Sequence, residues 1–237
     1  MRNALLNSLT PDVWSAWEPH FERVSLGYRE ELLHPGEPVR YLWFPESGIQ
    51  SQVVETLDGE SVEVAVVGPE GMVGLPAVFG VPYSNNRTIA QTDSDVWRVS
   101  VDEFRRNLHA DHPLLRRLER YAAAVMGSLA QIAACNRLHS AEERLCRWLL
   151  IVHDRAGRNR IPMTHEFLSL MLGTRRATVS DVANSLQDRG LIRYEPGAIE
   201  FVNVPAIEKA ACECYGVIRW MFEQSARGPN TIQGVSR

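Results

Sequence analysis

Residues 162–192 carry two runs of apolar residues at helical spacing, separated by a glycine. The first run spans about residues 164–172, and its apolar residues are Phe167, Leu168, Met171 and Leu172. The second run spans about residues 175–189, and its apolar residues are Val179, Val182, Ala183 and Leu186. Spacings of three and four place each set on one helix face, and Gly173 permits a reversal between them. The pattern predicts a helix-turn-helix.

The opposite face of the second predicted helix begins with two arginines. In a helix-turn-helix, the N-terminal part of the second helix enters the major groove of DNA. Arginine can donate two hydrogen bonds to a guanine edge, and threonine or serine can bind phosphate. The candidate DNA contacts are Thr164, His165, Thr174, Arg175, Arg176, Thr178 and Ser180. The alternative is an ordinary helical hairpin with a solvated arginine pair.

A β-hairpin is predicted directly after the second helix, from residues 191–194 and 198–202 around the turn Glu195-Pro196-Gly197. Two helices followed by a short hairpin indicate a winged helix-turn-helix, a pattern more specific than either part. Further helices are expected over residues 141–155 and 205–224.

Upstream of residue 113, short runs rich in Val, Ile and aromatic residues alternate with Gly, Pro and Asn turns. We expect helical structure over residues 3–20 and a short helix over residues 101–108. Between them we expect strands at residues 21–26, 31–34, 41–44, 48–56, 61–67, 88–92 and 95–100. Many short strands at this spacing indicate a β-sandwich or β-roll.

A long helix is predicted from about residue 113 to residue 136. Its apolar stripe consists of Leu118, Tyr121, Val125, Leu129 and Ile132. The stripe could pack against the β domain or form a two-stranded coiled coil between protomers, and its length of about three heptads favours a dimer interface.

The fold class is therefore α+β. We expect a β-roll sensor domain over residues 1–112, a dimerisation helix over 113–138, a winged helix-turn-helix over 139–225 and a flexible tail over 226–237.

The net charge of −4 is not that of a generally basic nucleic-acid binder, but it is unevenly divided. Residues 1–140 carry 12 Lys and Arg against 18 Asp and Glu, whereas residues 141–237 carry 13 against 11. The positive balance falls on the predicted winged helix-turn-helix, as binding to phosphate requires.

The four cysteines, Cys135, Cys146, Cys212 and Cys214, lack the spacing of a secreted disulfide framework. Cys212 and Cys214 fall on a predicted helix, where residues two apart point about 200° apart. We therefore expect no metal site, and Cys135 could approach its copy across a dimer axis. Motifs of catalytic loops and nucleophiles are not found, so no enzyme activity is expected. Without a signal sequence or a long apolar stretch, the predicted location is the cytoplasm, with no membrane partner.

Three stretches resemble the Crp/Fnr family of bacterial transcription regulators. Residues 68–75 (GPEGMVGL) with 86–88 (NRT) resemble its phosphate-binding cassette, 141–145 (AEERL) the helix after its dimerisation helix, and 173–180 (GTRRATVS) the start of its recognition helix. The resemblance covers nearly the whole chain. It implies a homodimer on a palindromic operator, control by a small effector at the β-roll, and RNA polymerase as a partner.

Two departures from the family pattern affect what the resemblance implies. The Glu that holds the ribose of a cyclic nucleotide is replaced by Leu75, after Gly74, and Leu75 cannot accept a hydrogen bond. Arg87 and Thr88 could still hold a phosphate, so a cyclic nucleotide remains a possible cofactor. The alternative for Arg87 is a structural ion pair.

The recognition helix departs as well. Arg176 matches the family's guanine-reading arginine, but Ala177 stands where Glu is common and Asp181 where Arg is common. We expect an operator half-site different from the usual one. Two other functions stay open: a regulator that needs no ligand, and an adaptor that uses its winged helix for protein contacts.

Overall fold

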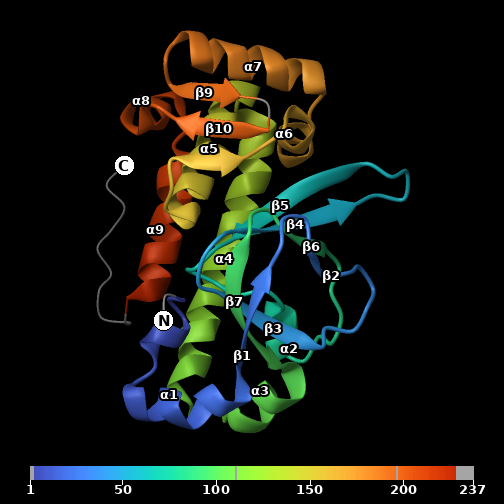
Figure 1. The fold of residues 1–237 in the computed structure, drawn as a ribbon, viewed down its shortest axis with the longest axis vertical. Coiled ribbons are helices and arrows are strands. Elements are labelled where there is room, and N and C mark those ends of the chain that lie inside the picture. Colours follow the sequence, from blue (N-terminus) through green and yellow to red (C-terminus); the bar gives the residue numbers. More distant parts are fainter. Residues whose placement is uncertain (1–2, 110, 196, 228–237) are drawn as a thin grey trace.

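The computed structural model describes residues 3–109, 111–195 and 197–227. Figure 1 shows a β-roll at one end of the molecule, a helical domain at the other, and a long helix that connects them. The α+β class expected from the sequence is confirmed. Pro196 and residues 228–237, which include most of the expected tail, lie outside the described residues.

The β-roll contains two antiparallel sheets. The first has the order β1-β7-β3, formed by Glu22–Leu26, Ser94–Ser100 and Tyr41–Pro45. The second has the order β2-β6-β4-β5, formed by Glu31–Leu33, Arg87–Ala90, Gln50–Glu55 and Ser61–Val67. Each expected strand is present, with ends shifted by at most two residues.

Short helices close the roll. The N-terminal stretch is one α-helix, α1 (Pro11–Trp17), between two 3₁₀ turns, η1 (Leu6–Ser8) and η2 (Glu18–His20). Two more helices follow, α2 (Leu75–Val78), which the sequence pattern did not predict, and α3 (Val101–Asn107). Pro11 and Pro19 stand where a helix can accept proline, in its first turn.

The long helix α4 (Pro113–Leu138) completes the core of the roll. Leu114, Leu118 and Tyr121 are buried among the aromatic residues of the strands and of α3. Tyr121 accepts a hydrogen bond from the Met72 backbone N–H at 3.3 Å, so the helix is fastened to the loop after β5.

The expected dimer stripe is therefore wrong for its first two residues. Leu118 is 0% exposed and Tyr121 is 2% exposed within this chain. Val125 packs beside them, and Ile132 packs against the core of the C-terminal domain. Leu129 alone of the five is exposed. An apolar stripe identifies a buried face, but not the partner that buries it, and here most of it contacts the same chain.

The C-terminal domain begins with α5 (Ala141–Ala156), which starts at a capping box between Ser140 and Glu143. It continues with α6 (His165–Leu172), α7 (Arg176–Asp188) and a sheet of order β8-β10-β9. The sheet strands are Arg160–Pro162, Ala198–Phe201 and Ile192–Glu195. The expected hairpin is confirmed, whereas the third strand of this sheet, β8, was not predicted.

The last expected helix is in fact two helices, α8 (Val204–Ala210) and α9 (Cys214–Ala226). Ala211 ends α8 in an extended conformation, with φ −79° and ψ 156°. In Figure 1, α9 then runs back alongside α4. The break places Cys212 in a connecting segment and changes the direction of its side chain relative to a continuous helix.

None of the described helices is long and apolar enough to cross a membrane.

Gly71 tests the packing of α4 on the roll. A Cβ atom at Gly71 would overlap the Tyr121 hydroxyl, so Gly71→Ala is expected to lower the free energy of unfolding by about 1–3 kcal/mol. Gly216→Ala is the control, because a Cβ there meets nothing within 4 Å in a helix interior, and it is expected to add about 0.5–1 kcal/mol. Urea unfolding measures both. A Gly71→Ala protein as stable as the parent would show that the ring can move aside.

Candidate nucleic-acid interface and effector cavity

The helix-turn-helix forms through local capping. The Thr164 hydroxyl accepts the Phe167 backbone N–H at 3.1 Å and starts α6. Gly173 ends α6 in the left-handed conformation, at φ +56°, where a residue with a Cβ is strained. The next helix, α7, buries Val179, Ala183 and Leu186 against the domain core. Both buried faces agree with the sequence pattern.

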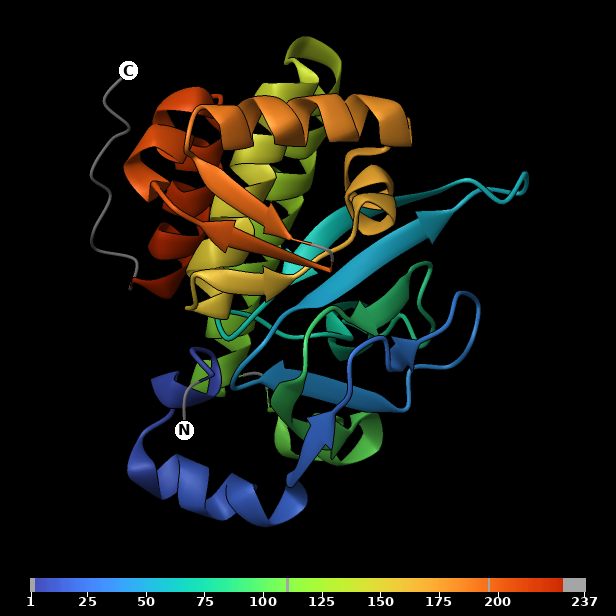
Figure 2. The ribbon, with the colours of Figure 1, turned by 45° about the horizontal axis from the view of Figure 1, so that its top comes forward.

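The other face of α7 is open to solvent. Arg175, Arg176 and Ala177 are exposed at its N-terminal end. Figure 2 shows α7 along the outer side of the C-terminal domain. The N-cap position of α7 is Arg175, whose guanidinium can only donate, so no side-chain cap occupies the N–H groups of the first turn. These groups and the helix dipole favour an anion at this end.

Several other arginines of the domain are paired with carboxylates. Arg189, at the far end of α7, contacts Glu142 at 2.5 Å, and Arg193 contacts Glu200 at 2.6 Å. Among the described residues, no ion pair involves Arg175 or Arg176. Two unpaired positive charges therefore stand together at the N-terminus of the exposed helix.

The neighbouring hydroxyl groups are less available. Ser180 donates to the Arg176 carbonyl at 3.0 Å, and the Thr164 oxygen is used as a cap. Thr174 and Thr178 are half-buried beside the arginines. The side chain of His165 lies outside the described part of the structure.

A cavity of about 290 Å³ lies between the roll, α4 and α5. Gly74 and Leu75 line it from the roll, and Tyr121, Val125 and Leu129 line it from α4. The expected phosphate-holding residues lie elsewhere. Among the described residues that line the cavity, neither Arg87 nor Thr88 is found.

Arg87 is engaged in ion pairs. Its guanidinium contacts Glu55 at 2.7 Å and Glu31 at 3.6 Å. Thr88, beside it on β6, is fully buried. The geometry matches the structural ion pair considered as the alternative for Arg87.

Buried charged groups join the roll to the C-terminal domain at the same cavity. Glu63 on β5 accepts a hydrogen bond from the Trp148 indole N–H of α5 at 2.5 Å. Arg155 of α5 contacts Glu70 at 2.8 Å and donates to the Val66 carbonyl. A Cβ at Gly173 would lie 3.1 Å from Val62, so β5 also touches the turn before α7.

Burial raises the pKa of Glu63 from its ordinary value of 4.5 to about 7, and hydrogen bonds from Ser51 and Trp148 oppose the rise. Glu63 was not among the candidate residues predicted from the sequence. A β-bulge interrupts the alternation of β5 beside Glu63, so Glu63 shares a face with Val66 and not with Ala65. Simple strand alternation in the sequence would therefore not have identified it.

The fold and site define a two-domain transcription regulator that joins a sensor-type roll to a winged helix-turn-helix. Residues 23–111 match the cyclic nucleotide-binding domain, and residues 143–210 match the Crp-like helix-turn-helix domain. The chain belongs to the Crp/Fnr family.

Relatives agree with this assignment. The "Cyclic AMP receptor protein" of Thermus thermophilus is 26% identical over 212 residues, which cover 79% of this chain and 91% of the relative. The structure of FixK2 from Bradyrhizobium japonicum matches with a TM-score of 0.69 at 20% identity, covering 81% of this chain and 98% of that one. TTHB099 from Thermus thermophilus matches with a TM-score of 0.68 at 24% identity, covering 79% and 96%. The two structures share the fold of this chain.

Glu63 makes stability depend on pH. Between pH 4.5 and 7 the folded protein keeps a proton that the unfolded chain has released, so stability falls as pH rises through this window and is level above it. Glu63→Gln, which stays neutral, should gain about 2–3 kcal/mol relative to the parent between pH 5 and pH 8.

Urea unfolding at the two pH values measures this gain. Glu60→Gln, at an exposed carboxylate of the same hairpin, is the control and should show none. An equal pH response of the parent and Glu63→Gln would mean that Glu63 titrates normally.

Proposed function

We propose that the protein is a transcription regulator that binds a roughly palindromic DNA operator as a homodimer. The observation that carries the proposal is the exposed, unpaired arginine pair at the N-terminus of α7. Family membership and the positive balance of the C-terminal residues support it. An adaptor that binds protein through the winged helix would not need unpaired cations at this end.

The roles of the contacts follow from their places. Arg176 is in the first turn of α7 and is proposed to read a base, while Arg175 just before it binds phosphate. Thr174 and Thr178 flank the pair and are proposed as phosphate contacts. Thr164, His165 and Ser180 remain candidates, although Thr164 and Ser180 already hold backbone groups. RNA polymerase remains a proposed partner.

The dimer is proposed to form through the exposed face of α4, opposite the face that packs on the roll. Ala123, Met126, Ala130 and Ala133 recur there at spacings of three, four and three. Met126 is 72% exposed and Leu129 is 38% exposed, so an apolar strip remains uncovered in one chain. Small residues at these positions would let two copies of α4 pack closely. A dimer axis here would present two α7 helices to two half-sites.

Control of DNA binding is proposed to act through the cavity beside Leu75. An occupant would contact the roll, α4 and α5 together, and could therefore shift the DNA-binding domain relative to the roll. One relative bears the name cyclic AMP receptor protein. In this chain Leu75 is apolar and Arg87 is held by carboxylates, which favours a different effector or regulation without a ligand.

The first test is selection of DNA fragments by the full-length protein, with and without cyclic AMP or cyclic GMP. We expect enrichment of a palindrome in the absence of either nucleotide. On the selected operator, Arg176→Ala should weaken binding by about 1–3 kcal/mol and relax one base position in each half-site.

Arg105→Ala is the control for charge. Arg105 is an exposed residue of α3, at the end of the molecule opposite α7 (Figure 1), and its removal should leave operator binding unchanged. Unaltered binding by Arg176→Ala would refute the proposed place of α7 in the groove.

The dimer has its own test. Met126→Glu places a charge on the proposed apolar strip and should halve the molar mass measured by light scattering. Leu57→Glu, at a fully exposed position on the β4–β5 hairpin, should keep the mass of the parent. A Met126→Glu protein of unchanged mass would exclude this face of α4 as the interface.

A further inference from the structure

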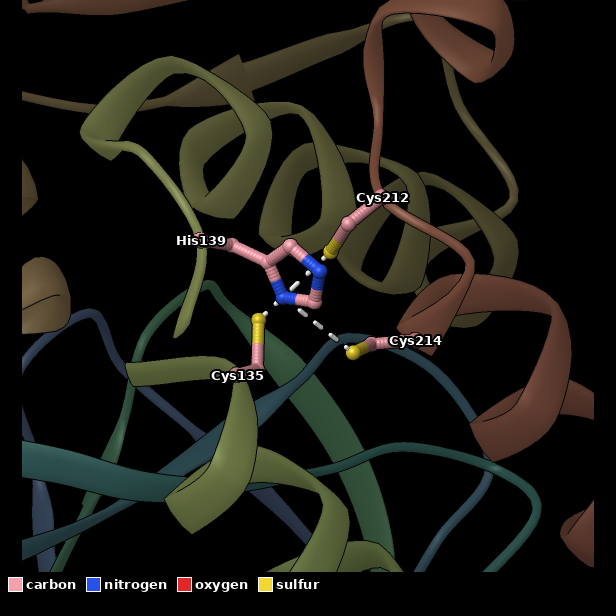
Figure 3. A group of neighbouring side chains, drawn as sticks. All are labelled: Cys135, His139, Cys212 and Cys214. Carbon is pink, nitrogen blue, oxygen red and sulfur yellow. Dashed lines mark hydrogen bonds between the residues drawn. The ribbon is translucent and has the colours of Figure 1, made fainter. Parts of the chain in front are cut away.

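Three cysteines and one histidine meet at the junction between α4 and α9 (Figure 3). Cys135 lies in the last turn of α4 and His139 directly follows the helix. Cys212 lies in the segment between α8 and α9, and Cys214 is the first residue of α9. Their sulfur and nitrogen atoms all lie within 4.8 Å of one another. The premise that Cys212 and Cys214 lie on one continuous helix is wrong, because the helix expected over residues 205–224 is broken before Cys212.

The distances suit one tetrahedral ion. A zinc ion bound by thiolates at 2.3 Å and by an imidazole at about 2.05 Å places two sulfurs about 3.8 Å apart, and a sulfur and a nitrogen about 3.5 Å apart. Cys135 and Cys212 have their sulfurs 3.5 Å apart. The Cys214 sulfur lies 3.6 Å from Nδ1 of His139. Three cysteines with one histidine are a common ligand set of structural zinc sites.

We propose that Cys135, His139, Cys212 and Cys214 bind one Zn²⁺ ion per chain. The widest separation in the group, 4.8 Å, needs to close by about 1 Å to reach the tetrahedral spacing. This inference does not depend on the proposed DNA-binding function.

The surroundings orient the ligands toward such an ion. Nε2 of His139 lies 3.3 Å from a carboxylate oxygen of Glu213. A histidine that donates Nε2–H to a carboxylate presents Nδ1 to a metal, which is the usual arrangement around zinc. Gln131 donates its side-chain N–H to the Cys214 sulfur at 3.1 Å. Such a bond stabilises a thiolate.

A positively charged side chain near the four ligands would balance the charge of a bound Zn²⁺ site. Zn²⁺ with three thiolates and a neutral imidazole carries one net negative charge. Arg144, near the start of α5, lies close enough to Cys135 for the two charges to interact. Arg144 also donates to the Leu172 carbonyl at the end of α6. The arginine that would balance the site therefore also reaches the helix-turn-helix.

Proton release accompanies binding. Burial raises the pKa of Cys212 and of Cys214, so both are thiols in the absence of a cation. Zn²⁺ displaces one proton from each of the three thiols into solvent, and no electron is transferred.

A single ion fits better than an iron–sulfur cluster. A cluster distributes its protein ligands over several iron atoms, and the four ligand atoms here converge on one point. The alternative to a metal site is that the cysteines are buried simply as small apolar residues. Cys146 is such a cysteine, because it is fully buried in the core of the C-terminal domain. That explanation leaves the inward-facing histidine and its carboxylate partner unaccounted for.

The test uses full-length protein purified under reducing conditions, stripped with a chelator and then titrated with Zn²⁺ or Co²⁺. We expect one equivalent of metal per chain, and with Co²⁺ the intense thiolate-to-metal absorption of a tetrahedral site. Cys212→Ser should lose this absorption. Cys146→Ser is the matched control and should keep it.

A second variant remains informative if Cys212→Ser does not fold. Glu213→Gln changes an exposed carboxylate outside the ligand set and should weaken Zn²⁺ binding by about 10–100-fold while circular dichroism stays that of the parent. Folded, reduced parent protein that takes up no Co²⁺ would overturn the proposal. So would equal loss of binding in Cys146→Ser, or a Cys135–Cys212 disulfide that forms in place of a metal site.

Discussion

The long helix α4 packs against the roll and against α9 at the same time. Leu114, Leu118 and Tyr121 on one face complete the core of the roll, and α9 packs along the same helix. The exposed strip around Met126 is left for a second chain in the proposed dimer. Because the helix is rigid, a movement imposed on any one of its faces is transmitted to the others. The arrangement of both domains therefore rests on how this helix is packed.

Buried charged groups between the roll and α5 also restrict how the two domains can be arranged. Glu63 and Arg155 are removed from water where the roll meets α5, and each is held by a hydrogen-bond or ion-pair partner across the junction. Separating the domains would expose these groups, whereas a small rearrangement would leave them buried with fewer partners, which is costly. The junction thus favours a few discrete arrangements of the DNA-binding domain over continuous motion.

The proposed ion site lies at the C-terminal end of α4, beyond the junction between the roll and α5. Cys135 and His139 lie at and just after the end of α4, and Cys212 and Cys214 lie just before and at the start of α9. An ion there would fix these two helices relative to one another, next to the point where the chain enters the DNA-binding domain. Arg144, whose charge interacts with that of Cys135, also donates to the Leu172 carbonyl at the end of α6. An occupant of the cavity and an ion at the proposed site would therefore both affect the position of α4.

Local patterns predicted most of the elements and the arginine pair of α7, because helix periodicity, caps and turn glycines act over a few residues. The partners of those elements were not predictable in this way. The α4 stripe was read as a dimer interface although Leu118 and Tyr121 are buried in their own chain. Arg87 was predicted to be a candidate phosphate ligand, but strand pairing places Glu31 and Glu55 beside it. The cysteine cluster depends on a helix break at Ala211 and on contacts 77 residues apart. Such contacts arise from how the elements pack, and a local pattern carries no information about segments so distant in the chain.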